Sequence, residues 1–307
     1  MQLGLTAAYQ VGIIFILIFV GFVMKQKGQI GDGGVRDMTN ILLNAVTPCV
    51  LISAYQKPFE PRLAVGLLRC AGFAVLTHAA AILIATLIFR KEETKRYRIN
   101  IFCSVYSNCG FMAIPLLHAL LGDEGVFFGS TYLAIFTICY WTHGVVAYSG
   151  SVKELSFRKA FLNPGVLGTL TSVLLFVFHI RLPGILAESV NYVAALNTPL
   201  AMIVLGTFLA KVNLKKAFLN PALYGVSFLR LILIPAVSLM LAWALRMNTL
   251  EAQSMLLPAL CPSATVSTLF AARFSLDAEY SAELVAITTL FSVLTIPLMM
   301  SVSTFII

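Results

Sequence analysis

Long apolar runs with almost no charged residues follow one another along the whole chain, and they restrict what it can fold into. Of its 307 residues, 59% are hydrophobic and only 11% are charged, whereas soluble domains carry roughly 25% charged residues. A chain with so few charges cannot cover a globule with polar surface, so the bilayer must be its solvent. A membrane-spanning helix needs about 20 mostly apolar residues, which leaves room for about ten such helices.

The sequence predicts an all-helical membrane protein with ten spans. They cover residues 5–24, 38–56, 63–89, 99–121, 126–148, 166–180, 190–209, 222–245, 254–274 and 282–306. Proline-containing segments predict interruptions in four spans, at 47–48, 107–115, 198–199 and 261–262. The first span has no basic residue before it, and Lys25 and Lys27 follow it. We therefore expect a retained first helix rather than a cleaved signal peptide.

Basic residues concentrate in alternate connections between the spans. One set of connections carries Lys25, Lys27, Arg36, Arg90, Lys91, Lys95, Arg96, Arg98, Lys153, Arg158, Lys159, Lys211, Lys215, Lys216 and Arg273. The other set carries only Lys57, Arg62, Arg181 and Arg246. Because Lys and Arg are retained on the cytoplasmic side, we expect a plasma-membrane protein with both termini outside. The formal charge of +8 then reflects topology, and no nucleic acid partner is expected.

The two halves of the chain resemble each other in order. Residues 40–48 align with 191–199, and residues 107–123 align with 261–277. Each half has five predicted spans, and a tandem copy of an odd number of spans must lie inverted in the membrane. Two repeats are therefore predicted, residues 1–160 and residues 161–307. Inverted repeats with interrupted helices at corresponding positions point to the binding site of a secondary transporter.

The interrupted segment of the fourth span supplies the first candidate site residues. Asn108, Cys109 and Gly110 precede Pro115, and a proline frees backbone groups that hydrocarbon cannot satisfy. Such a break is tolerated where it lines a cavity or is buried in protein. The alternative is a simple proline kink, with Asn108 bonded to a neighbouring helix.

The ninth span supplies the second set of candidates. Pro262 is followed by several hydroxyl side chains, including Ser263 and Thr265. These hydroxyls could instead bond back to their own helix. If both broken helices unwind where they cross, their half-helix N-termini would favour an anion. Neither interrupted segment contains a carboxylate.

Other polar residues are scattered along the chain. Arg230 lies near the middle of the eighth span, where an ionised group is usually functional, so we expect it to act in binding, gating or charge pairing, or to pair with a carbonyl. Arg69 is expected to extend to the membrane interface. Asp277, Glu279 and Glu283 are expected to be solvated. The histidines and cysteines form no ligand pattern, so no metal site and no cofactor are predicted.

These residues resemble the auxin efflux carrier family, which contains bacterial malate-permease-like proteins and the plant PIN auxin carriers. The resemblance covers essentially the whole chain and rests on residues 108–117, 163–164, 230–235, 262, 269–271 and 295–297. It implies two inverted five-helix repeats, as in sodium–proton antiporters and bile-acid transporters. It further implies a scaffold from spans one, two, six and seven, a transport domain from the other six, crossover of spans four and nine at the substrate site, and homodimers.

The resemblance also assigns individual residues. Asn108 and Pro115 match the fourth-span crossover and Pro262 matches the ninth, while Thr47 and Leu51 fall where the scaffold lines the site. Two positions differ from the plant carriers. Gly165 stands where the plant carriers have the last asparagine of an Asn-Pro-Asn motif, and Ser267 stands where they have a second crossover proline. The differences argue against an aromatic, auxin-like substrate and for a more hydroxyl-rich pocket.

The sequence therefore predicts a membrane transporter rather than an enzyme. It would move a small organic anion, a carboxylate such as malate or an auxin-like acid, by elevator-type alternating access, with H⁺ or Na⁺ as candidate coupling ions. The first alternative is a cation–proton antiporter of related fold, which would need a carboxylate near the crossover. An intramembrane enzyme and a receptor are the others, but the chain has no HExxH motif and no paired intramembrane aspartates.

Overall fold

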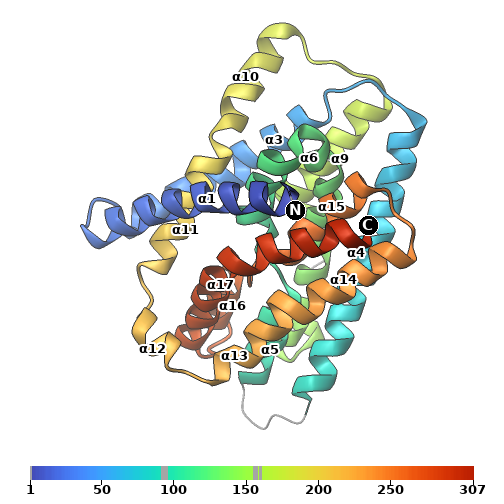
Figure 1. Ribbon diagram of the computed structural model, residues 1–307. Coiled ribbons are helices and arrows are strands. Elements are labelled where there is room, and N and C mark those ends of the chain that lie inside the picture. Colours follow the sequence, from blue (N-terminus) through green and yellow to red (C-terminus); the bar gives the residue numbers. More distant parts are fainter. Residues whose placement is uncertain (1, 91–95, 155–157, 159–160) are drawn as a thin grey trace.

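The computed structural model describes residues 2–90, 96–154, 158 and 161–307, and all regular elements in them are helical apart from one isolated antiparallel bridge, Ser107–Ser263 (Figure 1). Lys91, Lys95 and Lys159, used in the orientation argument, lie outside the described residues.

The first half contains α1 (Gln2–Gln26), α2 (Asp32–Ile41), η1 (Leu42–Val46), α3 (Thr47–Ala54), α4 (Pro61–Phe89), α5 (Arg96–Val105), η2 (Cys109–Ala113), α6 (Ile114–Cys139), η3 (Tyr140–Gly144), α7 (Val145–Ser149) and η4 (Val152–Glu154). The second half contains α9 (Pro164–Val177), α10 (Gly184–Ala195), α11 (Asn197–Leu209), α12 (Leu214–Phe218), α13 (Ala222–Phe228), η5 (Leu229–Leu233), α14 (Ile234–Ala244), α15 (Thr249–Leu260), α16 (Val266–Arg273) and α17 (Ala278–Ile306).

Seven described helical stretches are long and apolar enough to cross a membrane. They are Gly4–Gln26, Asp32–Ala54, Pro61–Phe89, Cys109–Ser149, Gly184–Leu209, Ala222–Ala244 and Ala278–Ile306. The predicted sixth span is the shorter helix α9, and the ninth is divided between α15 and α16. The prediction of an all-helical membrane protein is confirmed, and the count of ten spans stays a prediction.

The longest of these stretches, Cys109–Ser149, is bent at Gly122. This residue has φ 64° and ψ −159°, a conformation that glycine adopts without the steric cost other residues meet. The bend falls between the predicted fourth and fifth spans, so one stretch contains parts of both.

Three prolines follow a widened, π-helical turn. Pro48, Pro115 and Pro235 each occupy the second position of the α-helix that succeeds η1, η2 or η5. A proline lacks the N–H group and its ring crowds the carbonyl four residues earlier, so the preceding turn opens. The predicted interruption at Thr47-Pro48 is wrong, because the helix continues from α2 through η1 into α3.

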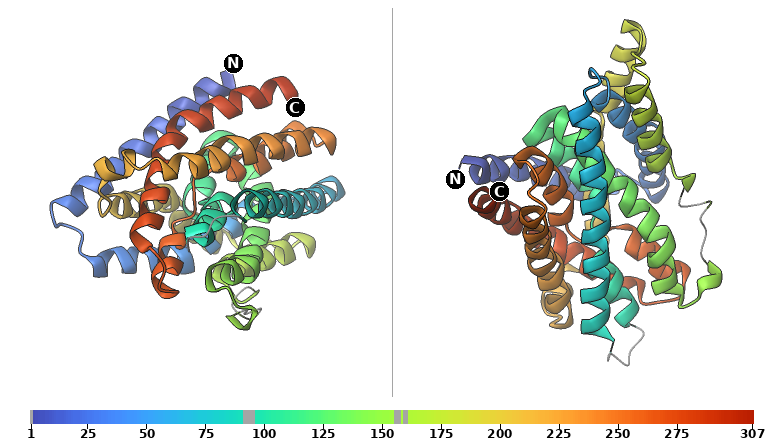
Figure 2. Two further views of the ribbon diagram at one scale, coloured as in Figure 1. Left: turned by 90° about the horizontal axis from the view of Figure 1, so that it is seen from below. Right: turned by 90° about the vertical axis from the view of Figure 1, so that its right-hand side faces the viewer.

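Helix α1 packs against α11 and α17, which brings the two ends of the chain together (Figures 1 and 2). Gly21 and Gly206 allow the close approach of α1 to α11, since a Cβ at either position would overlap a backbone carbonyl of the other helix, at Ile203 or Ile18. Small residues serve this purpose in membrane helices. Helix α3 packs against α9 and α10, whereas α6 packs against α4 and α15.

Candidate functional site

Two helices end in the interior of the protein and are followed by short non-helical segments. Helix α5 ends at Val105 and the chain becomes helical again at Cys109, while α15 ends at Leu260 and α16 begins at Val266. Cys261 is extended, with φ −62° and ψ 149°, a conformation that the proline after it favours over the helical one. In the first break the interruption precedes η2, so it lies upstream of Pro115 rather than at it.

The two breaks are paired through their backbones. The N–H of Asn108 donates to the carbonyl of Pro262 over 2.7 Å, and the N–H of Ala264 donates to the carbonyl of Tyr106 over 2.9 Å. Backbone groups that leave a helix inside a membrane protein must find other partners. Each break therefore supplies partners for the other, and residues about 150 positions apart in the sequence become neighbours.

A cavity of about 230 Å³ lies beside the paired breaks. Its walls come from α2, η1, α3, η2, α6, η3, α9, α11, α16 and the two breaks. The polar lining residues are Thr39, Asn44, Thr47, Ser107, Asn108, Thr137, Tyr140, Asn163 and Thr265. No Asp, Glu, Lys, Arg or His among the described residues lines this cavity.

Three lining residues carry buried polar atoms without a partner. The Nδ2 of Asn108, the Oγ1 of Thr47 and the Oγ of Ser107 make no hydrogen bond to any described residue, although the three residues are only 2%, 4% and 0% exposed. Buried polar atoms are almost always hydrogen-bonded, so exceptions call for an explanation. A polar ligand in the cavity would provide one.

The helices that restart after the breaks present their first turns to the cavity. Gly110 and Phe111 of η2 line one part of it, and Thr265 and Val266 at the start of α16 line another. The first N–H groups of a helix have no intrahelical partner, and the helix dipole places about half a positive charge there. The cavity therefore lies at two positive helix ends.

Apolar and aromatic side chains form the remaining walls. The rings come from Phe111, Phe136, Tyr140 and Phe208. Phe111 of η2 and Phe208 of α11 meet edge to face, with 6.4 Å between ring centroids. The walls therefore suit a ligand with an apolar body and a small polar head.

The structure brings some of the predicted site residues together and leaves others aside. Thr47, Asn108, Gly110 and Thr265 line the cavity, whereas Leu51, Cys109, Pro115, Pro262 and Ser263 do not. The hydroxyl of Ser263 donates instead to the carbonyl of Cys103 over 2.7 Å. Pro262 contributes through its carbonyl, which holds Asn108.

Several lining residues were missed by sequence reasoning. Asn44 precedes Thr47 by one helical turn and could have been found from that spacing, and Asn163 was noted only as part of a family motif. Asn163 caps α9 by accepting from the N–H of Gly165. Phe208 gave no signal, because nothing local distinguishes it from a residue that faces lipid.

Arg230 does not reach the cavity. It lies on η5, is fully buried, and donates to backbone carbonyls of Ser104, Val105 and Ala259. Of the roles considered for it, the pairing with carbonyls is the one that its hydrogen bonds display.

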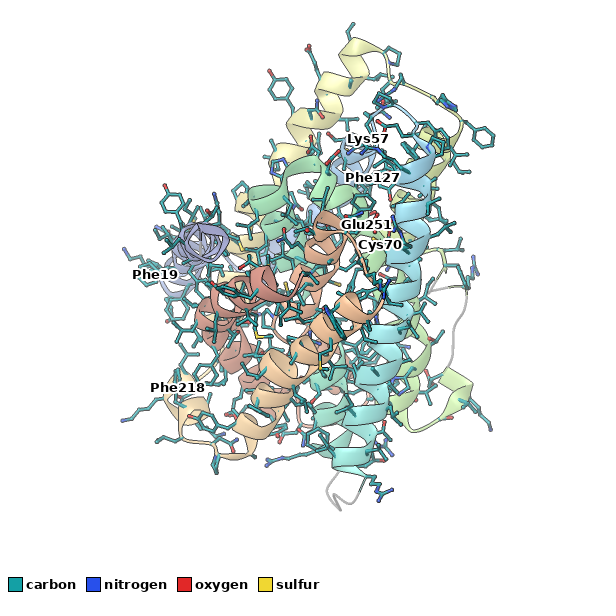
Figure 3. The ribbon with its side chains drawn as sticks, turned by 45° about the vertical axis from the view of Figure 1, so that its right-hand side comes forward. Phe19, Lys57, Cys70, Phe127, Phe218 and Glu251 are labelled. Atoms are coloured by element: carbon teal, nitrogen blue, oxygen red, sulfur yellow. The ribbon has the colours of Figure 1, made fainter. Side chains whose placement is uncertain are left out.

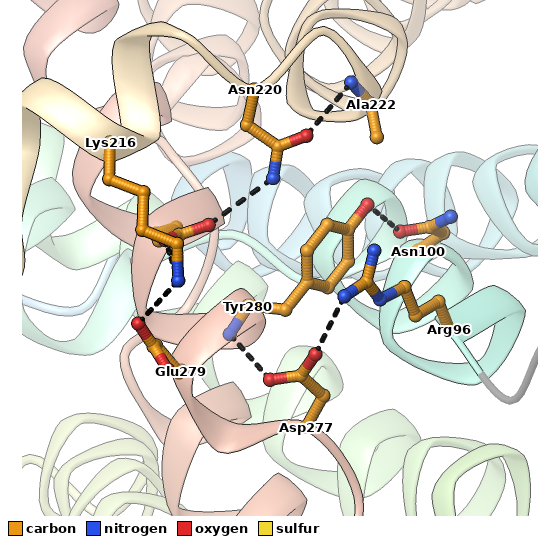
Figure 4. A network of polar contacts seen from close by, with 9 residues as sticks. Arg96, Asn100, Lys216, Asn220, Ala222, Asp277, Glu279 and Tyr280 are labelled. Atoms are coloured by element: carbon orange, nitrogen blue, oxygen red, sulfur yellow. Dashed lines mark hydrogen bonds and ion pairs between the residues drawn. The ribbon is translucent and has the colours of Figure 1, made fainter.

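Two carboxylates lie in the interior. Glu251 and Glu283 are 2% and 3% exposed, so the expectation that Glu283 is solvated is wrong. Asn220 donates to Glu283, and at the start of α17 Lys216 donates to Glu279 (Figure 4). Burial was not foreseeable, because it depends on how the segment around α12 folds over α17.

The described histidines, cysteines and carboxylates form no group of three or more that could hold a metal ion. The cysteines are all free thiols, and four of them are buried.

An all-helical, membrane-embedded chain with two paired helix breaks beside a cavity is consistent with a membrane transporter. The chain belongs to the membrane transport protein family, also called the auxin efflux carrier family, whose model matches residues 6–155 and 146–300. Members of this family are transporters rather than enzymes. The chain is similar to an uncharacterized transporter of Methanocaldococcus jannaschii, with 26% identity over 93% of this chain and 95% of the relative. It is also similar to one of Methanothermobacter thermautotrophicus, with 21% identity over 93% and 94% of the two chains.

Proposed function

We propose that this protein is a secondary transporter that moves a small organic anion, a carboxylate, across the plasma membrane by alternating access. The observation that carries the proposal is the cavity at the paired breaks, where the unpartnered Nδ2 of Asn108 lies close to two helix N-termini. The family supports transport. The substrate and the mechanism are inferred from the residues around the cavity.

The proposed negative charge of the substrate follows from the groups that line the cavity. Two positive helix ends attract an anion, and Asn108 can donate a hydrogen bond to it. A cation would find no carboxylate there among the described residues. This absence disfavours the alternative of a cation–proton antiporter, and coupling to H⁺ or Na⁺ would need groups outside the cavity.

The body of the substrate should be apolar. Aromatic rings surround the cavity, and no cationic side chain of the described residues is available for a second carboxylate. A dicarboxylate such as malate would have to bury that second charge without a partner, which is costly. We therefore favour a monocarboxylate with an apolar body, in contrast to the hydroxyl-rich pocket expected from Gly165 and Ser267.

Alternating access requires that one side be closed while the other is open. Three aromatic rings cluster at the C-terminal end of α3. The ring centroid of Tyr55 lies 4.4 Å from that of Phe127, which lies 5.2 Å from that of Phe176 on α9. The hydroxyl of Tyr55 is also bonded to that of Ser130 over 2.7 Å. With both termini outside the cell, this cluster would close the outer side while the cavity faces the cytoplasm.

Lys57 lies at the edge of this cluster. Its ammonium group is 4.8 Å from the centre of the Phe127 ring (Figure 3). Burial holds the pKa of Lys57 below its usual value, and the nearby carboxylates Glu124, Asp123 and Glu60 partly offset the effect. In the proposed elevator, α1, α2–α3, α9 and α10–α11 form the scaffold and the dimer contact, and the remaining helices move.

The proposal is tested with purified protein and a small panel of ligands. Thermal unfolding in detergent is followed with phenylacetate, malate, their primary amides and phenethylamine. A ligand at a hundredfold excess over its dissociation constant stabilises by about 2.7 kcal/mol. Phenylacetate should stabilise most, and its uptake into proteoliposomes should saturate. Stabilisation by the amine but by neither carboxylate would reverse the proposed sign of the substrate.

A further inference from the structure

Arg230 is the largest of the fully buried side chains. It lies on the widened turn η5, and no acidic side chain of the described residues is among the groups that act on its charge. Burying an unpaired cation is expensive unless hydrogen bonds and dipoles compensate it. The hydrogen-bond acceptors around Arg230 therefore indicate which negative charges its guanidinium group compensates.

Its hydrogen bonds to backbone carbonyls go to the ends of the two broken helices. One terminal nitrogen donates to the carbonyls of Ser104 and Val105, over 3.1 and 2.9 Å. The other donates to the carbonyl of Ala259. These carbonyls belong to the last turns of α5 and α15, which end at Val105 and Leu260.

The last carbonyls of a helix lack intrahelical partners and carry the negative end of its dipole. Two such ends converge on one guanidinium, whose planar fork can reach both. The positive ends of η2 and α16, across the breaks, have no corresponding anionic side chain at the cavity among the residues that the structure describes.

We propose that Arg230 is a positioning residue for anion binding: it compensates the negative ends of α5 and α15, so that the positive helix ends dominate the potential in the cavity. The inference rests on the proposed function and deepens it. Arg230 does not touch the substrate, yet it sets the preference of the site for negative charge through the backbone of both breaks.

A purely mechanical brace is the competing interpretation, and charge separates the two. Arg230→Gln keeps hydrogen-bond donors but removes the charge, whereas Arg230→Lys keeps the charge but loses the fork. A unit charge acting over about 10 Å at an effective dielectric constant of about 20 changes the affinity for an anion by roughly 15-fold.

The potential can be measured without a substrate. The Gly110→Cys substitution places a thiol at the cavity wall, where a Cβ meets nothing within 4 Å. Its rate of reaction is compared for a sulfonate-bearing and a trimethylammonium-bearing methanethiosulfonate, with the parent protein as background. Adding Arg230→Gln should lower the anionic-to-cationic rate ratio by at least about 10-fold, and Arg230→Lys should change it by less than about 3-fold.

Arg98 provides the matched control. It donates to the carbonyls of Tyr148 and Ser149 at the end of α7, which is the same kind of contact at a helix that does not line the cavity. Arg98→Gln should leave the rate ratio unchanged. Thermal unfolding shows whether every variant is folded. If Arg230→Gln does not fold, the rate ratio of Arg230→Lys, which keeps the charge but not the fork, decides between the two interpretations.

Affinities for phenylacetate and phenylacetamide give the second measurement. Arg230→Gln should weaken phenylacetate at least about 10-fold and the neutral amide by less than about 3-fold. Equal losses for both ligands, or an unchanged rate ratio, would overturn the inference in favour of a brace. If the thiol reacts with neither reagent, the affinity comparison decides alone. If the rate ratio in Gly110→Cys falls with Arg230→Gln as expected but the wild-type protein binds no carboxylate, the proposed function is refuted and the assigned potential stands.

Discussion

Arg69 on α4 donates to the carboxylate of Glu251 on α15 over 2.9 Å and thereby joins the two halves of the chain. The side chain of Glu251 is 2% exposed and that of Arg69 is 46% exposed, so the acid is the buried partner. Glu251 lies beside Cys70 (Figure 3). Gly66 leaves the space for it, because a Cβ there would lie 2.7 Å from Oε1 of Glu251. Arg69 is therefore a partner of a buried acid and not only a residue extending to the interface.

Arg69→Gln should destabilise the protein by leaving a buried carboxylate without its cation. Breaking a fully buried pair costs about 3–5 kcal/mol, and the half-exposed arginine reduces this to about 1–2 kcal/mol. Unfolding in mixed detergent micelles measures the loss. The double variant Arg69→Gln/Glu251→Gln should recover part of it, and a double variant less stable than the single one would show that the charge pair is not the cause.

Asn108→Ala should weaken substrate binding while the protein stays folded. The backbone N–H that pairs with Pro262 remains in the variant, and only the cavity-facing amide is lost. Removing one hydrogen bond to a charged ligand costs about 1.5–3 kcal/mol, or roughly 10- to 150-fold in affinity. Phenylacetate binding and uptake measure the effect, and the exposed Asn40, substituted by alanine, is the control. Wild-type affinity in Asn108→Ala would remove this amide from the site.

Gly21→Ala should destabilise the contact between α1 and α11. The added Cβ would overlap the backbone carbonyl of Ile203, which cannot move as a side chain can. Overpacking of this kind costs about 1–3 kcal/mol. Gly12→Ala on the same helix is the matched control, since its Cβ would meet nothing within 4 Å. Thermal unfolding in detergent should separate the two variants, and equal midpoints would contradict the described packing of α1 on α11.

Lys216→Met should reduce stability in a manner that depends on pH and salt. The hydrogen bond to Glu279 raises the pKa of Lys216 above its usual 10.5. A lysine whose pKa is higher in the folded than in the unfolded protein stabilises the fold at any pH below its pKa in the unfolded protein. This contribution disappears as the pH rises through its pKa in the folded protein. The difference from wild type should therefore be constant near about pH 8, shrink as the pH rises past the usual lysine value of 10.5 and shrink with added salt. A difference that grows with pH would exclude the ion pair as its source.

Local signals in the sequence located the two breaks but not the walls of the cavity. Pro262 ends α15 by stereochemical rules that act on neighbouring residues, and the position of Asn108 followed from the repeat. The contact of Phe111 with Phe208 depends on how α11 packs against η2. In a membrane protein an apolar residue gives no sign of whether it faces lipid or a cavity, because both positions favour the same side chains.

The same limit applies to charge. The positions of Arg69, Arg230 and Glu283 were visible in the sequence, but their partners were not. Arg230 pairs with backbone carbonyls that a sequence does not distinguish from any others. The family resemblance, by contrast, was confirmed over nearly the whole chain, because it depends on many positions at once.

The pairing of the two breaks also has a consequence for biogenesis. During synthesis the first half of the chain enters the bilayer before residue 262 exists, so the N–H of Asn108 and the carbonyl of Tyr106 cannot yet have the partners they hold in the finished protein. Unsatisfied groups of this kind cost several kcal/mol each in hydrocarbon. The first half should thus stay open to proteases or membrane chaperones until the ninth span inserts, and co-translational insertion would end with a late closing step rather than with two halves that mature independently.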